Sequence, residues 1–335
     1  MPKIVNRVLD ALSNIWKELP PLPFLILGFI LSCFFVRNFA SVYNLKVFCL
    51  QSVDLLVICC GITFVLLNGG IDFSVTAILS LNSVVGAYIM ALSPLAKTPS
   101  IAIPTAIVVM LLLGLLVGTV NGIAVAFLKM PSFIATLATQ LAVSGSAILF
   151  LSVVTEKTSI TGLPEAFFAF GGSRSFFIIP VIIAAVSWLF CYWLLGFTRF
   201  GRSLYAVGVN PKVAFISGIS IKKTVFLIML LSSFFGAIAS IISTARNQVG
   251  LPSLGDKLFI SVIAAVIVGG TSTAGGFGGL KQTLVGVLFI TLINNTMNLL
   301  RVEWYAITVI QGFIILISTI MSAYFQKARK YGGKK

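Results

Sequence analysis

Residues 98–128 read TPSIAIPTAIVVMLLLGLLVGTVNGIAVAFL and contain no Asp, Glu, Lys or Arg. About 20 apolar helical residues span the hydrocarbon core of a bilayer, so this stretch is long enough to cross a membrane. Similar stretches recur along the chain, one of them interrupted only by Asp54. The pattern predicts an all-α, polytopic membrane protein with about ten transmembrane helices, at residues 19–36, 47–71, 73–96, 98–128, 130–155, 175–198, 224–245, 258–280, 282–300 and 304–326.

The composition supports a membrane protein and argues against several other classes. Hydrophobic residues make up 59% of the chain, and the net charge is +15. The basic residues lie in short loops and near the ends, which is typical of topology signals and contacts with anionic lipids rather than of nucleic-acid binding. The chain has no histidine, and its five cysteines show no metal-ligand spacing. We therefore expect no metal site, no catalytic site and no nucleic-acid partner.

The loop charges predict the orientation of the chain. With the N-terminus inside, 15 of the 23 Lys and Arg residues fall in inside segments and 8 fall in outside segments. This bias predicts that both ends lie in the cytoplasm. Residues 258–280 give the weakest signal for a crossing, because the apolar run before the glycine cluster at 269–279 is short for a membrane span. Residues 258–300 are thus expected to form either two full crossings or a re-entrant hairpin, and both leave the C-terminus on the same side.

No segment is long enough to form a separate soluble domain. We expect a single transmembrane domain over residues 1–335, with a cytoplasmic N-terminus at 1–18, a cytoplasmic loop at 199–223 and a basic cytoplasmic tail at 327–335. The glycine cluster at 269–279 does not match an ATP-binding phosphate loop, because Leu280 separates Gly279 from Lys281 and Gln282 follows the lysine. The chain is therefore expected to lack an ATPase site of its own.

The loop at 199–223 contains a short predicted helix. Asn210 is a good N-cap, Pro211 suits the first helical position, and Gly218 is placed to end the helix in a left-handed conformation. This helix is too short to cross the membrane and is accompanied by several cations. It is expected either to lie among the lipid headgroups or to dock a cytoplasmic partner.

Two glycine clusters predict breaks between membrane helices. One is Asn68-Gly-Gly-Ile-Asp-Phe-Ser74, in which Asp72 is expected to cap the following helix, and the other is the cluster at 269–279. A third set, Gly114, Gly118 and Gly122, repeats every four residues within one span and predicts close helix packing. The residues expected to form the breaks are Gly69, Gly70, Gly269, Gly270, Gly275 and Gly276.

A few polar side chains fall inside the predicted spans. Asp54 is ionisable and is therefore a candidate functional group, with a protonated or hydrogen-bonded carboxyl between helices as the alternative. Each neutral amide is expected either to bond one helix to another or to line a path. Asn294, Asn295 and Asn298 together are expected to place amides on one side of their helix, because 294 to 298 is one helical turn. Neutral amides would suit an uncharged polyhydroxylated solute better than an ion. The candidates for the path are Asp54, Asn121, Gln140, Asn294, Asn295 and Asn298.

Four motifs, in order along most of the chain, resemble those of one protein family. They are Asn68-Gly-Gly-Ile-Asp-Phe-Ser74; Gly118-Thr-Val-Asn-Gly122 followed by Met130-Pro-Ser-Phe-Ile-Ala-Thr-Leu137; Thr198-Arg-Phe-Gly-Arg-Ser-Leu-Tyr-Ala-Val-Gly-Val-Asn-Pro211 with Ser217-Gly-Ile219; and Ile263-Ala-Ala-Val-Ile-Val-Gly-Gly-Thr-Ser-Thr-Ala-Gly-Gly-Phe-Gly278. The chain resembles the permease subunits of bacterial ABC-type sugar importers of the ribose, xylose, galactose and arabinose class. It departs from them at Phe259, Ile260 and Ser261, where the family usually carries Glu-Leu-Asp, and at Asp54, where a neutral residue is expected.

The resemblance implies a multi-pass protein of the bacterial cytoplasmic membrane that forms a path for a sugar. It implies as partners a second permease subunit, identical or different, cytoplasmic ABC ATPase subunits that carry ATP and Mg, and a periplasmic or lipid-anchored sugar-binding protein. The cytoplasmic loop would then couple the path to the ATPases. The residues to which this role carries over are Arg199, Gly201, Arg202, Tyr205, Asn210, Pro211, Lys212, Phe215 and Gly218.

Two alternatives stay open at this point. Related permeases carry nucleosides, so the solute is either a sugar or a nucleoside. A self-sufficient secondary transporter would instead use Asp54 as its coupling carboxylate and would need no ATPase.

Overall fold

The computed structural model describes residue 19, residues 21–172 and residues 177–332, without the side chains of Lys257, Thr319 and residues 321–332. The part of the chain that the structure describes is mainly helical and contains no strand, which confirms the all-α prediction. Ile160 and Gly250 form one isolated antiparallel bridge. The predicted N-terminal segment 1–18 and the side chains of the basic tail 327–335 lie outside the described residues.

The long helices follow the predicted spans closely. Every predicted span except residues 258–280 corresponds to one helix over most of its length, and six helices of the described part are long and apolar enough to cross a membrane. The helices are α2 (Leu22–Phe35), α3 (Val42–Leu67), α4 (Ser74–Ala91), α5 (Pro99–Ala126), α6 (Ser132–Val154), α7 (Ile178–Phe197), α8 (Arg199–Val209), α9 (Pro211–Ile216), α10 (Ile221–Asn247), α11 (Phe259–Gly269), α12 (Leu280–Leu299) and α13 (Trp304–Gly332), with 3₁₀ turns η1 (Pro94–Lys97), η2 (Glu165–Gly171) and η3 (Asp256–Leu258).

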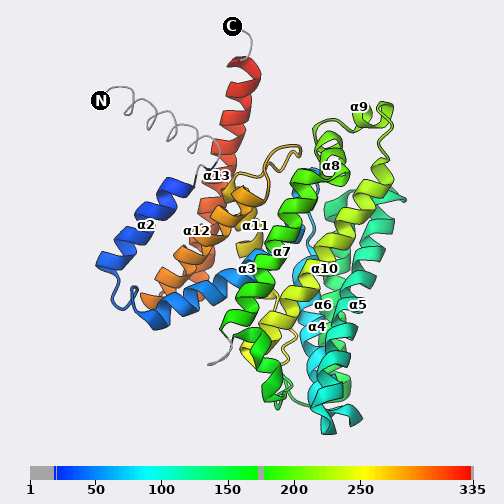
Figure 1. The fold of residues 1–335 in the computed structure, drawn as a ribbon, viewed down its shortest axis with the longest axis vertical. Coiled ribbons are helices and arrows are strands. Elements are labelled where there is room, and N and C mark those ends of the chain that lie inside the picture. Colours follow the sequence, from blue (N-terminus) through cyan, green and yellow to red (C-terminus); the bar gives the residue numbers. More distant parts are fainter. Residues whose placement is uncertain (1–18, 20, 173–176, 333–335) are drawn as a thin grey trace.

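The bundle is built around α3, α4 and α10, which are the most buried of the long helices. Helices α5, α6 and α7 form its periphery, and α2, α12 and α13 lie on the other side of α3 (Figure 1). The peripheral helices expose Leu and Ile side chains in large number, as helices facing lipid do. The buried centre therefore consists of the helices that carry Asp54, Asp72 and the polar residues around them.

The predicted glycine stripe on α5 packs against α10. A Cβ atom on Gly114 would lie 2.9 Å from the carbonyl oxygen of Ser233, and one on Gly118 would lie 2.8 Å from the Cβ atom of the same serine. A Cβ atom on Gly122 would meet the ring of Phe226 at 2.7 Å. These distances leave no room for a side chain and confirm that the stripe allows close approach of two helices.

One predicted crossing is not a single helix. Helix α11 has 11 residues, about 16 Å at 1.5 Å per residue, which is about half of the hydrocarbon core. Before it, the chain runs irregularly beside α4, where the amides of Leu251 and Gly255 donate to the hydroxyls of Ser83 and Ser80, both at 3.1 Å. Residues 258–280 thus contain a short helix that ends at the predicted glycine break, and an irregular strip precedes it in which serine hydroxyls satisfy backbone groups that lipid could not. Both predicted arrangements of residues 258–300, two full crossings or a re-entrant hairpin, stay predictions.

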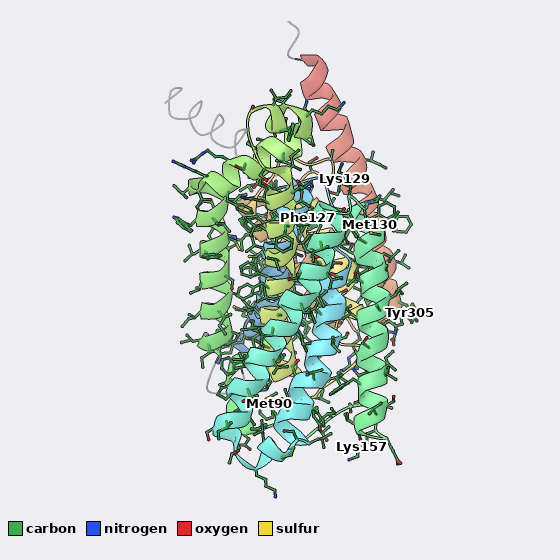
Figure 2. All side chains as sticks on the ribbon, turned by 90° about the vertical axis from the view of Figure 1, so that its right-hand side faces the viewer. Met90, Phe127, Lys129, Met130, Lys157 and Tyr305 are labelled. Atoms are coloured by element: carbon green, nitrogen blue, oxygen red, sulfur yellow. The ribbon has the colours of Figure 1, made fainter. Side chains whose placement is uncertain are left out.

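The connections separate into two ends of the molecule. Phe127, Lys129 and Met130 lie at the end that carries α8 and α9, whereas Met90 and Lys157 lie at the opposite end (Figure 2). Helix α13 extends beyond the other helices at the end of α8 and α9 (Figure 1). The segments that the loop charges assign to one side of the membrane are thus found together. The assignment of that side to the cytoplasm stays a prediction.

Candidate functional site

Helices α8 and α9 form the connection between α7 and α10. The hydroxyl of Thr198 caps α8 by accepting a hydrogen bond from the amide of Gly201 at 3.3 Å. A Cβ atom on Gly201 would lie 1.9 Å from the carbonyl oxygen of Leu195, so only glycine lets α8 turn this sharply away from α7. Leu204 and Val207 are buried on the inner face of α8. The sequence reasoning missed this helix and placed only the shorter one that follows.

Helix α9 is the predicted short helix. The side chain of Asn210 accepts hydrogen bonds from the amides of Lys212 (3.0 Å) and Val213 (3.2 Å), and Gly218 ends the turn with a φ of +80°. These contacts confirm the predicted cap and the predicted stop.

The outer face of α9 is apolar and largely uncovered. Phe215 is 70% exposed and Ile216 is 83% exposed, while Ala214 is buried against the bundle. Both exposed residues border a groove of about 340 Å³ that Lys212 and Ile221 also line. A short capped helix thus presents an apolar tip with lysine beside it.

Tyr205 joins α8 to the glycine loop, defined here as residues 270–279. Its hydroxyl donates a hydrogen bond to the carbonyl oxygen of Gly278 at 2.7 Å. Burial raises the pKa of the Tyr205 phenol, so the group stays protonated and remains a donor at neutral pH. One residue of the predicted coupling loop therefore binds the loop between α11 and α12.

The two predicted glycine breaks meet each other. The amide of Gly276 donates to the carbonyl oxygen of Leu67, the last residue of α3, at 2.8 Å. Gly69, Gly275 and Gly276 all have positive φ, at +77°, +86° and +71°. Gly270 also has a positive φ, of +111°, and ends α11. The predicted tight turns are confirmed, and their contact with one another is a finding that no sequence pattern indicated.

Asp72 is buried and joins four helices. Its Oδ1 atom accepts hydrogen bonds from the amide (2.9 Å) and the hydroxyl (2.6 Å) of Ser74, and its Oδ2 atom accepts one from Ser232 on α10 at 2.7 Å. Asn121 on α5 donates to the hydroxyl of Ser74 at 2.7 Å and accepts from Thr139 on α6 at 2.7 Å. The N-cap position of α4 is Phe73, which makes no side-chain cap hydrogen bond, so Asp72 stands one residue before the predicted position, although its carboxylate accepts from the amide of Ser74 at the start of the helix. Asn121, a candidate for the path, belongs to this network.

Asp54 is buried at the middle of α3 and forms an ion pair with Arg246 on α10. Its Oδ2 atom also accepts a hydrogen bond from Ser243 at 2.8 Å, and Arg246 donates in addition to the carbonyl oxygen of Leu50 at 2.7 Å. The Oδ1 atom of Asp54 has no hydrogen-bond partner. This carboxylate connects α3 to α10, two of the three most buried long helices, and its cation lies 192 positions further along the chain, where a sequence pattern gives no sign of it.

The amides near residue 295 bind different neighbours. Asn295 and Asn44 exchange two hydrogen bonds, at 2.9 and 3.0 Å, which join α12 to α3. Asn294 instead accepts from Gln311 on α13 at 2.6 Å, and Gln311 also donates to Ser261 on α11 at 3.1 Å. The expectation that these amides share one side of the helix is therefore wrong for Asn295, which faces α3.

The remaining two candidates for the path are less buried. Gln140 lies on α6 and is partly exposed, and Asn298 lies in the last turn of α12 and is exposed. No contact in the described part of the chain connects them to the other candidates. Their place in a path stays a prediction.

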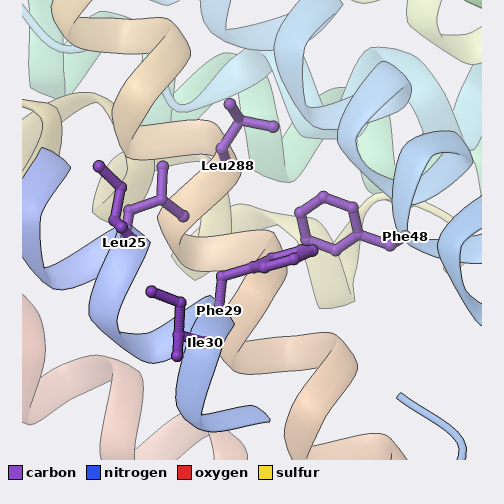
Figure 3. A pocket seen from close by; sticks show the side chains of 6 residues that line it. Leu25, Phe29, Ile30, Phe48 and Leu288 are labelled. Atoms are coloured by element: carbon purple, nitrogen blue, oxygen red, sulfur yellow. The ribbon is translucent and has the colours of Figure 1, made fainter. Parts of the chain in front are cut away.

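The groove between α2, α3 and α12 is lined only by apolar side chains. It has a volume of about 280 Å³, and Leu25, Phe29, Ile30, Phe48 and Leu288 surround it (Figure 3). It offers nothing that could hydrogen-bond a polar solute. This groove is therefore not a site for a sugar.

Comparison with known proteins decides the family. The model of the family described as "Branched-chain amino acid transport system / permease component" matches residues 44–319. The ribose import permease protein RbsC of Bacillus subtilis is 37% identical over 268 residues, which cover 78% of this chain and 79% of the relative. The chain belongs to the permease subunits of bacterial ABC-type sugar importers. No solved structure matches this permease.

Two further relatives extend over most of the permease. The L-arabinose transport system permease protein AraH of Escherichia coli is 33% identical over 329 residues, or 96% of the permease and 94% of the relative. The galactose/methyl galactoside import permease protein MglC of Salmonella typhimurium is 29% identical over 309 residues, or 89% and 90%. The permease is thus a multi-pass membrane protein of the ribose, arabinose and galactose class.

Of the positions at which this permease departs from the family pattern, Asp54 and Ser261 are buried and Phe259 and Ile260 are half-buried. The ring of Phe259 packs on that of Phe73, with centroids 5.2 Å apart, so that the start of α11 touches the start of α4. Ser261 takes part in the contact with Gln311 and Asn294. At both positions the residue that differs from the family pattern makes a contact that holds α11 against a neighbouring helix.

Proposed function

We propose that this permease forms the translocation path for a monosaccharide or a related neutral, polyhydroxylated solute. The names of its relatives, which are permeases for ribose, L-arabinose and galactose, support a sugar. The family description also includes permeases for branched-chain amino acids, so the solute class rests on these relatives. The polar residues of the buried centre are neutral amides and hydroxyls apart from Asp54 and Asp72, and both of these carboxylates are already bound to protein groups.

The energy for transport is proposed to come from separate ATPase subunits that dock on α9. The observation that carries this proposal is the exposed tip of α9, where Phe215 and Ile216 stand uncovered at one end of the bundle. Five cations accompany it in the same connection, at Arg199, Arg202, Lys212, Lys222 and Lys223. An amphipathic knob of this kind suits a groove on a protein partner with an acidic rim.

The proposed topology has ten crossings, counting residues 250–269 as one discontinuous crossing, with both ends in the cytoplasm. The excess of Lys and Arg at the end of α8 and α9 supports it. The protein would lie in the bacterial inner membrane as a single transmembrane domain. The end opposite α9 would then face the extracytoplasmic binding protein.

The proposed assembly contains two permease subunits, two ATPases and a sugar-binding protein. ATP and Mg would be bound by the ATPases, and no cofactor is assigned to this chain. An ion-coupled mechanism through Asp54 gains no support, because Arg246 already neutralises that carboxylate.

Reconstitution tests this proposal. The permease, its ATPase and its binding protein are placed in vesicles with ATP inside, and uptake of labelled ribose, arabinose and galactose is compared with that of a nucleoside and leucine. Saturable uptake of one sugar, competed by other sugars only, is expected. Uptake of leucine or of a nucleoside in preference to every sugar would refute the proposed solute class.

A further inference from the structure

Three segments that are distant in the sequence meet at one point, called here the glycine junction. It consists of the end of α3 at Leu67, the end of α8 at Gly208 and the glycine loop at Gly276 and Gly278. Two hydrogen bonds cross it, from the amide of Gly276 to the carbonyl oxygen of Leu67 and from the hydroxyl of Tyr205 to that of Gly278. The junction therefore links the cytoplasmic loop, the break before α4 and the break before α12.

The contacts at the junction are between backbones. A Cβ atom on Gly208 would lie 2.0 Å from the carbonyl oxygen of Leu67 and 2.7 Å from the amide nitrogen of Gly276. A Cβ atom on Gly275 would lie 2.9 Å from both the carbonyl oxygen of Gly208 and the amide nitrogen of Gly69. No side chain with rotational freedom separates the segments. A displacement of α8 must therefore move the glycine loop with it, since packed interiors transmit strain.

The junction lies between the exposed surface of α9 and the short helix α11. On one side, only Asn210 separates α8 from α9, the proposed docking helix. On the other side, the glycine loop begins where α11 ends, and α11 is half the length of a membrane crossing. The far end of α11 rests on Phe73 through Phe259. A continuous series of contacts thus connects α9 through α8 and the glycine loop to α11 in the middle of the bundle.

We propose that the glycine junction transmits the movement of α8 and α9 to α11 during the transport cycle, with Tyr205 and Gly208 as its positioning residues. The proposal rests on the proposed function, because it needs an ATPase that moves α9. It assigns to Tyr205 a role in coupling rather than in docking, because its hydroxyl is turned to the glycine loop and away from the exposed tip.

The test uses the assembled importer and conservative variants. Tyr205→Phe removes the hydroxyl and keeps the ring, and Tyr43→Phe, at an exposed tyrosine on α3, is its control. Gly208→Ala adds one methyl group to the junction, and Gly196→Ala is its control, because a Cβ atom on Gly196 meets nothing within 4 Å. Both glycines are helical, so the change in helix propensity is matched.

Two quantities are measured for each variant: sugar transported per ATP hydrolysed, and the ATP-dependent change in amide hydrogen exchange of residues 259–269. Loss of one hydrogen bond is expected to lower the first by about two- to ten-fold in Tyr205→Phe and to weaken the second, with ATP hydrolysis and assembly retained. Gly208→Ala is expected to have the larger effect, and both controls are expected to match the wild type.

The inference is overturned if Tyr205→Phe keeps the wild-type transport ratio and the wild-type exchange response. It is also overturned if transport and hydrolysis fall together in Tyr205→Phe at a constant ratio, since that result indicates weaker assembly. If Gly208→Ala fails to assemble, the result for Tyr205→Phe alone tests the inference. A wild-type importer that shows no ATP-dependent uptake would instead refute the proposed function.

Discussion

Truncation of Phe215 is expected to detach the permease from its motor without disturbing its own fold. The side chain is 70% exposed, and it lies on a helix of six residues that is held at Asn210 and Ala214. Removal of such a side chain changes the stability of the permease by no more than about 0.5 kcal/mol. The substitution is therefore expected to weaken binding of the ATPase and to leave the stability of the permease nearly unchanged.

The size of that effect on binding follows from the exposed area. A phenylalanine side chain contributes about 200 Å², so the 70% that is exposed amounts to about 140 Å². At about 25 cal/mol per Å², complete coverage by the ATPase is worth about 3.5 kcal/mol, or roughly 300-fold in affinity. Phe215→Asp is expected to cost more, because it also places a carboxylate against an apolar groove.

The assay is binding of the purified ATPase to the permease in nanodiscs, followed by sugar uptake in vesicles. Phe215→Ala is expected to weaken binding by roughly 300-fold and to abolish uptake at ATPase concentrations that saturate the wild type. The control is Phe34→Ala, which changes an 81% exposed phenylalanine on α2. Wild-type affinity and uptake in Phe215→Ala would show that α9 does not dock the ATPase.

Three further predictions concern packing inside the bundle. Arg246→Ala leaves the Asp54 carboxylate buried without its cation and is expected to lower the free energy of unfolding by about 3 kcal/mol. Asp54→Asn is expected to cost less, because Arg246 reaches solvent. Equal melting temperatures of the two variants would contradict this prediction. Gly118→Leu is expected to abolish assembly, whereas Gly145→Leu is expected to be tolerated, because a Cβ atom on Gly145 meets nothing within 4 Å. Higher expression of folded Gly118→Leu than of folded Gly145→Leu would contradict this prediction. Asn295→Ala leaves a buried amide unpaired and should cost about 1–3 kcal/mol in chemical denaturation, and an unchanged midpoint would rule this out.

Local signals in the sequence predicted the elements that depend on local chemistry. Uncharged runs located the long helices because lipid tolerates little else over such lengths. Asn210, Pro211 and Gly218 located α9 because a cap, a first turn and a left-handed stop each need a particular residue. The stripe at Gly114, Gly118 and Gly122 was recognisable because helix packing repeats every four residues.

Long-range partners could not be predicted in the same way. The cation of Asp54 is 192 positions away, and nothing near Arg246 distinguishes it from other basic residues at helix ends. The length of α11 was obscured because irregular and helical segments in a membrane are equally apolar. The helix α8 was missed because Gly201 and Gly208 weaken its helical signal, and both are required by contacts with other segments.

The central claim is that the permease is a passive path whose energy arrives through α9. The most direct test compares vesicles that contain the purified permease alone with vesicles that contain the complete importer. The account predicts no ATP hydrolysis and no sugar uptake by the permease alone, with or without a proton or sodium gradient, and ATP-dependent uptake by the complete importer. Hydrolysis of ATP by the isolated chain, or uptake of sugar driven by an ion gradient in its vesicles, would contradict the claim.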